Sequence, residues 1–287
     1  MRLVLREARE AAGYTQLDVA EQMEWSLSKV IRIENGDVTI APNDLRPLLN
    51  YLNVKDRAQV ADLLATAKIA RTRQRQAWYQ KPEFREHLTD GLRRLIEYET
   101  EATSVYTYSV FHIPALLQIP SYSSALIQMW RDDLTDTQRH YRLEARRLRR
   151  EAVLERSHPL RMTVVLDESV FWRAVGGPQV FADQLEEVLR LEEQQSVAIR
   201  MFPFTADTGL SYDAGFDILF LGDEDEATET GDKINAVMYR ETGASDEVIE
   251  DKALATRHFA RYRKLWEAAT NEEETVDFIR KRVRELR

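Results

Sequence analysis

The chain has 287 residues, of which 44% are hydrophobic and 31% charged, and its formal net charge is −9. This length predicts about two domains with a substantial core. There is no cysteine and no apolar run of about 18 residues, which excludes disulfides, thiolate metal sites and a membrane-spanning helix. The first residues do not form a signal peptide, so we expect a soluble, cytoplasmic protein.

The charge is unevenly distributed along the chain. Residues 1–75 hold 12 Lys/Arg and 10 Asp/Glu, whereas the remaining residues hold 28 and 39. The first part is therefore slightly basic and the second strongly acidic. Any surface that binds nucleic acid is expected in the N-terminal part.

The segment from Thr15 to Gly36 predicts two short helices joined by a tight turn. Thr15 and Ser26 are expected to be N-caps, and Gly36 is expected to end the second helix in the left-handed conformation. The inward faces are predicted from apolar residues at helical spacing, namely Leu17, Val19, Ala20, Met23, Val30, Ile31 and Ile33. Two helices connected in this way form a helix-turn-helix, whose second helix enters the DNA major groove.

The outward face of the predicted recognition helix, residues 26–35, suits a DNA groove. Its exposed side chains are expected to be Leu27, Ser28, Lys29 and Arg32. The arginine can bond a guanine edge bidentately, the serine can donate or accept, the lysine can contact phosphate or guanine, and the leucine can touch a thymine methyl group. Thr15 and Gln16 begin the first helix and suit backbone phosphates. The alternative is an ordinary helical hairpin with a solvated basic face.

The runs AREAAGYTQLDVAEQ and SKVIRIENG closely resemble the Xre/lambda-repressor-like family of helix-turn-helix proteins. The resemblance rests on the Thr15-Gln16 start, the small Ala20 and the closing Glu34-Asn35-Gly36, and it implies DNA binding. The sequence departs from the family at Glu24, where the turn usually has Gly. A Glu with positive φ costs roughly 1 kcal/mol relative to Gly.

The rest of the N-terminal sequence predicts three more helices, which begin near Leu3, Asn43 and Asp56. In the first of them Arg9 is expected to point outward. Together with the helix-turn-helix they would form a five-helix bundle over residues 1–70. A polar, basic linker is expected over residues 71–83.

Residues 84–287 predict an α+β domain with about four strands, so the expected fold class is mainly α with a smaller α+β part. The strand candidates are Met162–Leu166, Val197–Phe202, Phe216–Leu221 and Ala236–Arg240, and a further β-prone stretch begins at Val105. Helices are expected over about 84–103, 122–131, 137–156, 169–174, 179–193, 246–269 and 272–286. The basic helix 137–156 is interleaved with Glu, so internal ion pairs are expected.

Four polar aromatic residues of the second domain, Tyr106, Tyr108, His112 and Tyr122, could line a small-molecule pocket. Core packing is the alternative. The five histidines lack metal-binding spacing. There is no phosphate-binding loop and no nucleophile elbow. We therefore expect no enzymatic activity, no catalytic residue, no metal and no cofactor.

The run IPALLQIPSY, Ile113–Tyr122, resembles a domain of unknown function that follows the Xre-like motif in many actinobacterial regulators. Matching pieces occur in order at Trp78-Tyr79, Glu99 with Glu101-Ala102, Arg142, Arg146, Leu166–Glu168, Gly176–Pro178, Gln184-Leu185, Met201–Phe204 and Tyr239–Glu241. The sequence departs from the pattern at Ala115 and Ile119. The resemblance implies a regulator of development or secondary metabolism, often encoded next to a small partner protein.

These observations predict a dimeric, sequence-specific transcriptional regulator that binds double-stranded DNA and no membrane. One such module makes few base contacts, and two modules on half-sites about one helical turn apart give useful specificity. The second domain would serve dimerisation and the sensing of a small-molecule effector or a partner protein. The alternative is an antitoxin-like interaction module that binds a small partner protein and autoregulates its operon.

Overall fold

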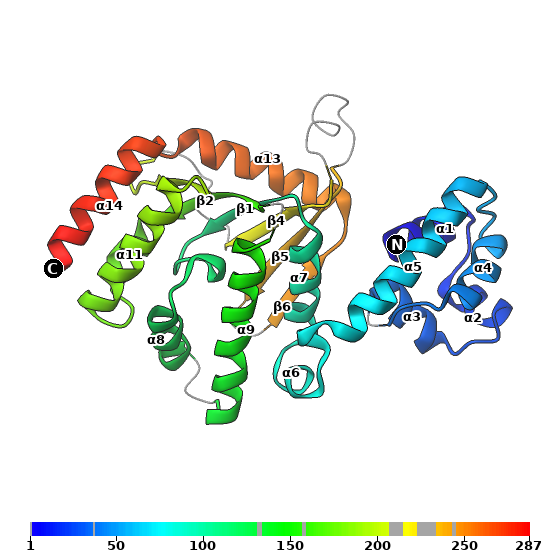
Figure 1. Ribbon diagram of the computed structural model, residues 1–287. Coiled ribbons are helices and arrows are strands. Elements are labelled where there is room, and N and C mark those ends of the chain that lie inside the picture. Colours follow the sequence, from blue (N-terminus) through cyan, green and yellow to red (C-terminus); the bar gives the residue numbers. More distant parts are fainter. Residues whose placement is uncertain are drawn as a thin grey trace. The chain divides into compact units, whose positions relative to one another are not determined.

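The computed structural model describes residues 2–36, 38–130, 134–156, 159–206, 215–222, 234–242 and 245–287. The chain forms two compact units, Met1–Lys81 and Pro82–Arg287. The first unit is helical, and the described strands all belong to the second (Figure 1). The predicted fold class, mainly α with a smaller α+β part, is confirmed.

The first unit is a bundle of five helices followed by a short 3-10 turn. These elements are α1 (Arg2–Ala11), α2 (Gln16–Gln22), α3 (Leu27–Asn35), α4 (Pro42–Tyr51), α5 (Arg57–Gln76) and η1 (Trp78–Gln80). Their apolar faces enclose one core, in which Leu5, Val19, Val30, Leu45 and Leu49 are almost fully buried. Helix α5 runs to Gln76, so that it includes the first part of the stretch expected to be a linker.

Two side chains of this bundle point in the opposite direction from the predicted one: Leu17 was expected inward and Arg9 outward. Leu17 is 52% exposed, because it precedes the buried Val19 by two residues and so lies about 200° around α2 from it. Arg9 is only 9% exposed, because it lies one helical turn after Leu5 on the inward face of α1. Its charge is tolerated there because Glu34 of α3 pairs with it.

The described strands of the second unit form one six-stranded mixed sheet in the order β3-β2-β1-β4-β5-β6. The strands are β1 (Ser104–Ser109), β2 (Arg161–Asp167), β3 (Val197–Phe202), β4 (Phe216–Phe220), β5 (Ala236–Thr242) and β6 (Ser245–Ile249). Strands β1, β2 and β3 are parallel, whereas β4, β5 and β6 each run antiparallel to a neighbour. The four strand candidates correspond to β2–β5, and the β-prone stretch corresponds to β1.

The last strand corrects the helix expected over residues 246–269. Ser245–Ile249 pairs with β5 as an edge strand, and α13 (Lys252–Ala268) begins only after it. The carboxylate of Asp251 caps this helix by accepting from the amides of Ala253 and Leu254. The expected helix over 84–103 is likewise two helices, α6 (Pro82–His87) and α7 (Asp90–Glu101), since Thr89 caps the second.

Helices cover both faces of the sheet (Figure 1). The remaining ones are α8 (Pro120–Trp130), α9 (Asp136–Leu154), α10 (Ser169–Trp172), α11 (Pro178–Glu193) and α14 (Glu272–Leu286), with a 3-10 turn η2 (Ala115–Leu117). Helix α13 packs on one face, where Tyr108 and Tyr262 are buried. Helices α7, α8, α9 and α11 lie on the other face, which we call the α9 face.

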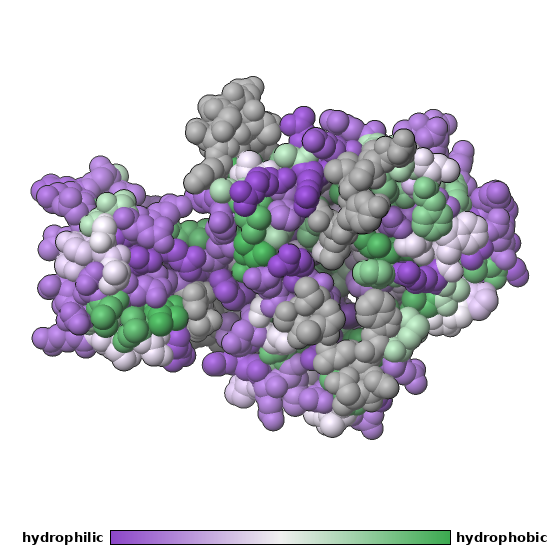
Figure 2. Space-filling view, turned by 180° about the vertical axis from the view of Figure 1, so that it is seen from behind, coloured by the Kyte–Doolittle hydropathy of each residue, from purple (hydrophilic) through white to green (hydrophobic). Residues whose placement is uncertain are grey.

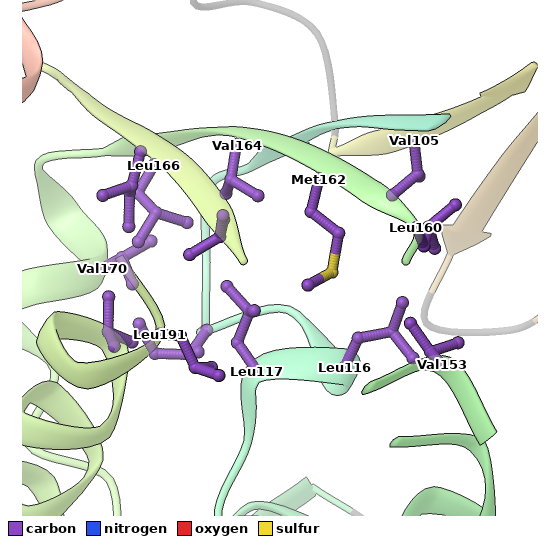
Figure 3. Packing of buried hydrophobic residues seen from close by; sticks show 14 of the residues in the cluster. Val105, Leu116, Leu117, Val153, Leu160, Met162, Val164, Leu166, Val170 and Leu191 are labelled. Atoms are coloured by element: carbon purple, nitrogen blue, oxygen red, sulfur yellow. The ribbon is translucent and has the colours of Figure 1, made fainter. Parts of the chain in front are cut away.

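The larger core of the second unit lies on the α9 face. Figure 3 shows Val105, Met162 and Val164 of the sheet pointing toward Leu117 of η2 and Val153 of α9. Because side chains alternate along a strand, Val105 faces α9 while its neighbours face α13. The polar strand residues whose side chains point to the α9 face therefore lie opposite the basic helix α9.

The outer surface is mainly hydrophilic in the view of Figure 2, where hydrophobic areas form separate patches. No helix in the described part of the chain is long and apolar enough to cross a membrane.

Candidate nucleic-acid interface

Side-chain caps set the ends of the two helices of the helix-turn-helix. The Thr15 hydroxyl accepts from the amide of Asp18 at 3.2 Å, and the Asp18 carboxylate accepts from the amide of Thr15 at 2.7 Å, which together form a capping box. Ser26 accepts from the amide of Lys29 at 3.2 Å. Gly36, with φ of 82°, ends α3 in the left-handed conformation. All three expected caps are confirmed.

The turn between α2 and α3 is tight and carries a strained residue. Glu24, at the position where the family usually has Gly, has a positive φ of 52°. The next amide, of Trp25, donates to the carbonyl of Ala20 at 2.8 Å and closes the turn. Ala20 is 2% exposed, and its small side chain permits the close approach of α3.

A buried carboxylate joins the first three helices. Glu34 of α3 accepts from Arg9 of α1 through Nε at 2.6 Å and Nη2 at 3.0 Å. It also accepts from the side-chain amide of Gln16 at 2.8 Å. Hydrogen bonding to Glu34 raises the pKa of Arg9. The network fixes the orientation of α3 relative to α1 and α2, and one amide hydrogen of Gln16 is used for it.

Three of the four predicted recognition residues are exposed on the surface of α3. Leu27 is 40% exposed, and Ser28 and Arg32, four residues apart, lie on one exposed face. The Arg32 side chain makes no hydrogen bond or ion pair with a described residue. Its five donors are therefore available to a ligand.

The fourth residue, Lys29, pairs with other residues of the bundle. Its ammonium lies 3.0 Å from a carboxylate oxygen of Asp44 and 3.8 Å from the centre of the Trp25 ring. Neither partner could be predicted from the sequence around Lys29. Asp44 lies in the first turn of α4, fifteen residues further along the chain, and no local pattern connects it to α3.

The structure does not bring together the four residues expected to line a ligand pocket. Tyr106 and Tyr108 face α13, whereas Tyr122 is fully buried on the α9 face, so the sheet separates them. The Tyr122 hydroxyl accepts from the amide of Ile113 at 3.2 Å. His112 is half-buried, and its Nδ1 donates to the carbonyl of Ile113 at 3.1 Å. In the part of the chain that the structure describes, no group of His, Asp and Glu could hold a metal ion.

Two family models match this chain. The model described as "Helix-turn-helix domain" matches residues 1–63. The model described as "Domain of unknown function (DUF5753)" matches residues 92–281, which is more than half of the chain. The chain belongs to the DUF5753 family. In this DUF5753 protein a helix-turn-helix domain precedes a domain of unknown function, which confirms the domain types and the order that the two sequence resemblances implied. Comparisons with curated proteins and with solved structures gave no match.

Proposed function

We propose that this DUF5753 protein is a sequence-specific DNA-binding transcriptional regulator that reads the major groove with α3. The free guanidinium of Arg32 on the exposed face of α3 carries the proposal. It can bond a guanine edge without breaking an internal interaction. The matched helix-turn-helix domain supports the same conclusion.

The other contacts follow from the same orientation. Ser28 lies on the face of Arg32 and can bond a base edge, and Leu27 can contact a thymine methyl group. Lys29 would reach the DNA only after it leaves Asp44. Thr15 and Gln16, at the start of α2, would contact phosphates and fix the register of the protein on the duplex.

The regulator would act as a homodimer. A single helix-turn-helix makes few base contacts, and two-fold related modules bind half-sites about 34 Å apart. We assign dimerisation and the sensing of an effector or partner to the second unit, which holds most of the negative charge.

The proposal is tested by fluorescence anisotropy on the DNA upstream of the protein's own gene, with a scrambled duplex of equal composition as control. We expect tight binding to the native duplex, a two-fold symmetric footprint and affinity that falls steeply with salt. Equal, weak binding to both duplexes across upstream and genome-selected sites would contradict the proposal.

A second candidate, an antitoxin-like module that binds a small partner protein, is supported by exposed aromatic residues. Phe111, Trp172 and Phe204 are 46%, 49% and 64% exposed and follow the carboxyl ends of β1, β2 and β3. Glu168 links two of them, since it accepts from the Trp172 indole at 3.2 Å and from the amide of Phe204 at 2.8 Å. Exposed Trp, Phe and Arg are enriched at the centres of protein interfaces.

The guanidinium of Arg282 lies 4.6 Å from the Trp172 ring and adds a basic edge to this surface. Co-expression with a small protein encoded next to this gene tests the second candidate. Co-purification that is lost in Trp172→Ala would support it, and no co-purification of the wild-type protein would contradict it.

A further inference from the structure

Two arginines on the same face of α9, Arg146 and Arg149, have very different bonding partners. Arg149 forms a bidentate ion pair with Glu99. Arg146, about one turn earlier, forms no ion pair with a described residue. Its guanidinium donates at 2.8 Å to the amide oxygen of Gln118, which is a neutral acceptor.

The surroundings of Arg146 disfavour the positive charge of its guanidinium. Its side chain is half-buried, and burial lowers the pKa of its guanidinium. Arg142 and Arg149 lie on the same face of α9 and add positive charge. Glu241 attracts it, but not from ion-pairing distance. A cation enclosed by protein ordinarily has a bonded anion, because desolvation is otherwise uncompensated.

Arg146 is also held in place. Gln118 is 3% exposed, and its oxygen accepts from Ser123 at 2.8 Å while its nitrogen donates to the carbonyl of Ile113 at 2.7 Å. The fully buried Gln184 of α11 fixes the same segment through two bonds to the backbone of Leu117 and Ile119, at 2.9 and 2.8 Å. The chain thus builds a rigid support for a guanidinium that has no anion.

Polar groups of the sheet lie opposite this arginine. Thr107, Asp217 and Tyr239 are neighbours in register across β1, β4 and β5, and they share the α9 face. Thr107 donates to Asp217 at 2.6 Å. The Tyr239 hydroxyl makes no hydrogen bond with a described residue, and burial raises its pKa, so that it remains a donor. Glu241, two residues along β5, shares this face and is exposed, which gives access from solvent.

We propose that the α9 face of the second unit binds a small ligand that carries an oxyanion, a carboxylate or a phosphate, between Arg146 and Tyr239. The guanidinium and the phenol donate to the oxyanion, and Asp217 and Glu241 accept from the hydroxyl or amino groups of the same ligand. The anion site would serve the effector sensing that we assign to the second unit, and it rests on the proposed function in that respect alone.

The test is the thermal unfolding of the full-length protein in titrations with inorganic phosphate and with citrate, at constant ionic strength set with sodium chloride. We expect a saturable rise in Tm for the wild-type protein. The rise should vanish in Arg146→Leu and should require at least a tenfold higher anion concentration in Tyr239→Phe. The matched control is Arg147→Leu, an exposed position on the same helix whose arginine pairs with Glu144 and Glu151. It should respond as the wild-type protein does.

A second readout does not depend on the ligand. Without added anion, Arg146→Leu should have a Tm equal to or above that of the wild-type protein, because it removes an unpaired charge. If Arg146→Leu does not fold, Arg146→Lys keeps the charge, and its loss of the forked donor should weaken anion binding at least several-fold. The proposal is overturned if neither anion raises Tm beyond sodium chloride, or if the Arg146 variants respond as the wild-type protein does.

Because no DNA is present, the result is independent of the helix-turn-helix. If the protein responds to the anion but binds no operator, the proposed regulatory function is contradicted and the proposed anion site still stands. The reverse result would contradict the site alone.

Discussion

The Arg149 guanidinium and the Glu99 carboxylate form a bidentate ion pair between α9 and α7, with Nη2–Oε1 at 2.6 Å and Nε–Oε2 at 3.0 Å. Glu99 is 4% exposed and Arg149 is 7% exposed. The expectation that the basic helix makes internal ion pairs is thus met at its most buried arginine. The two groups satisfy each other, so that neither is available to a ligand.

Removing one partner of this pair should therefore destabilise the second unit strongly. Arg149→Leu leaves Glu99 buried and unpaired, and we expect a loss of about 3–5 kcal/mol in the free energy of unfolding. The double variant Glu99→Leu/Arg149→Leu should recover most of it. Urea denaturation of the two single variants and the double variant measures this coupling, and additive effects would show that the pair does not act as a unit.

Asp217 should make stability depend on pH. Burial raises its pKa to about 6, above its usual value near 3.8. The folded protein therefore holds this proton more tightly than the unfolded chain does. The stabilisation is complete below about pH 4 and is lost as the pH rises through 6.

Asp217→Asn keeps a neutral side chain at all pH values and can still accept from Thr107. It should match the wild-type protein near pH 4 and exceed its free energy of unfolding by about 1–3 kcal/mol at pH 7.5. Urea midpoints of both proteins across this range give the comparison. A difference that stays constant with pH would contradict the assignment.

Glu24→Gly should stabilise the first unit. The left-handed φ of 52° is available to glycine without a Cβ penalty, so we expect a gain of about 0.5–1 kcal/mol. Glu21→Gly, in α2, is the control and should destabilise by a similar amount. Thermal unfolding of both variants measures the effect, and a loss of stability in Glu24→Gly would show that the turn is not strained.

Asp44→Asn should strengthen DNA binding. It releases Lys29 from its ion pair and removes a negative charge beside α3. We expect an affinity several-fold higher at low salt and a salt dependence steeper by about one phosphate contact. Asp62→Asn, an exposed change of equal charge on α5, is the control. Equal gains in both variants would mean that only net charge matters.

The helix-turn-helix could be predicted in detail because its signals are local. Thr15, Ser26 and Gly36 act on amides and carbonyls within a few residues of themselves. That the charge of Arg9 is tolerated on the inward face could not be predicted, because it depends on Glu34, twenty-five residues away.

The second unit was harder to predict because its elements depend on distant partners. Ser245–Ile249 has only two apolar residues and forms a strand because β5 offers its edge. The site opposite Arg146 combines α9, the segment around Gln118 and two strands. Gln118, Arg146, Tyr239 and Glu241 occur in the sequence resemblance, but their meeting on one face of the sheet is a property of the topology.

The most direct test of the account is a binding cycle between Arg32 and a guanine of the operator, measured by fluorescence anisotropy. Arg32→Ala should weaken binding to the native duplex by about 1–3 kcal/mol. Replacing the contacted guanine by 7-deazaguanine should weaken binding by the wild-type protein but have little further effect on binding by the variant. Arg57→Ala, an exposed change on α5, is the control. If Arg32→Ala binds the native duplex as tightly as the wild-type protein does, α3 does not read the major groove through Arg32, and the central claim is wrong.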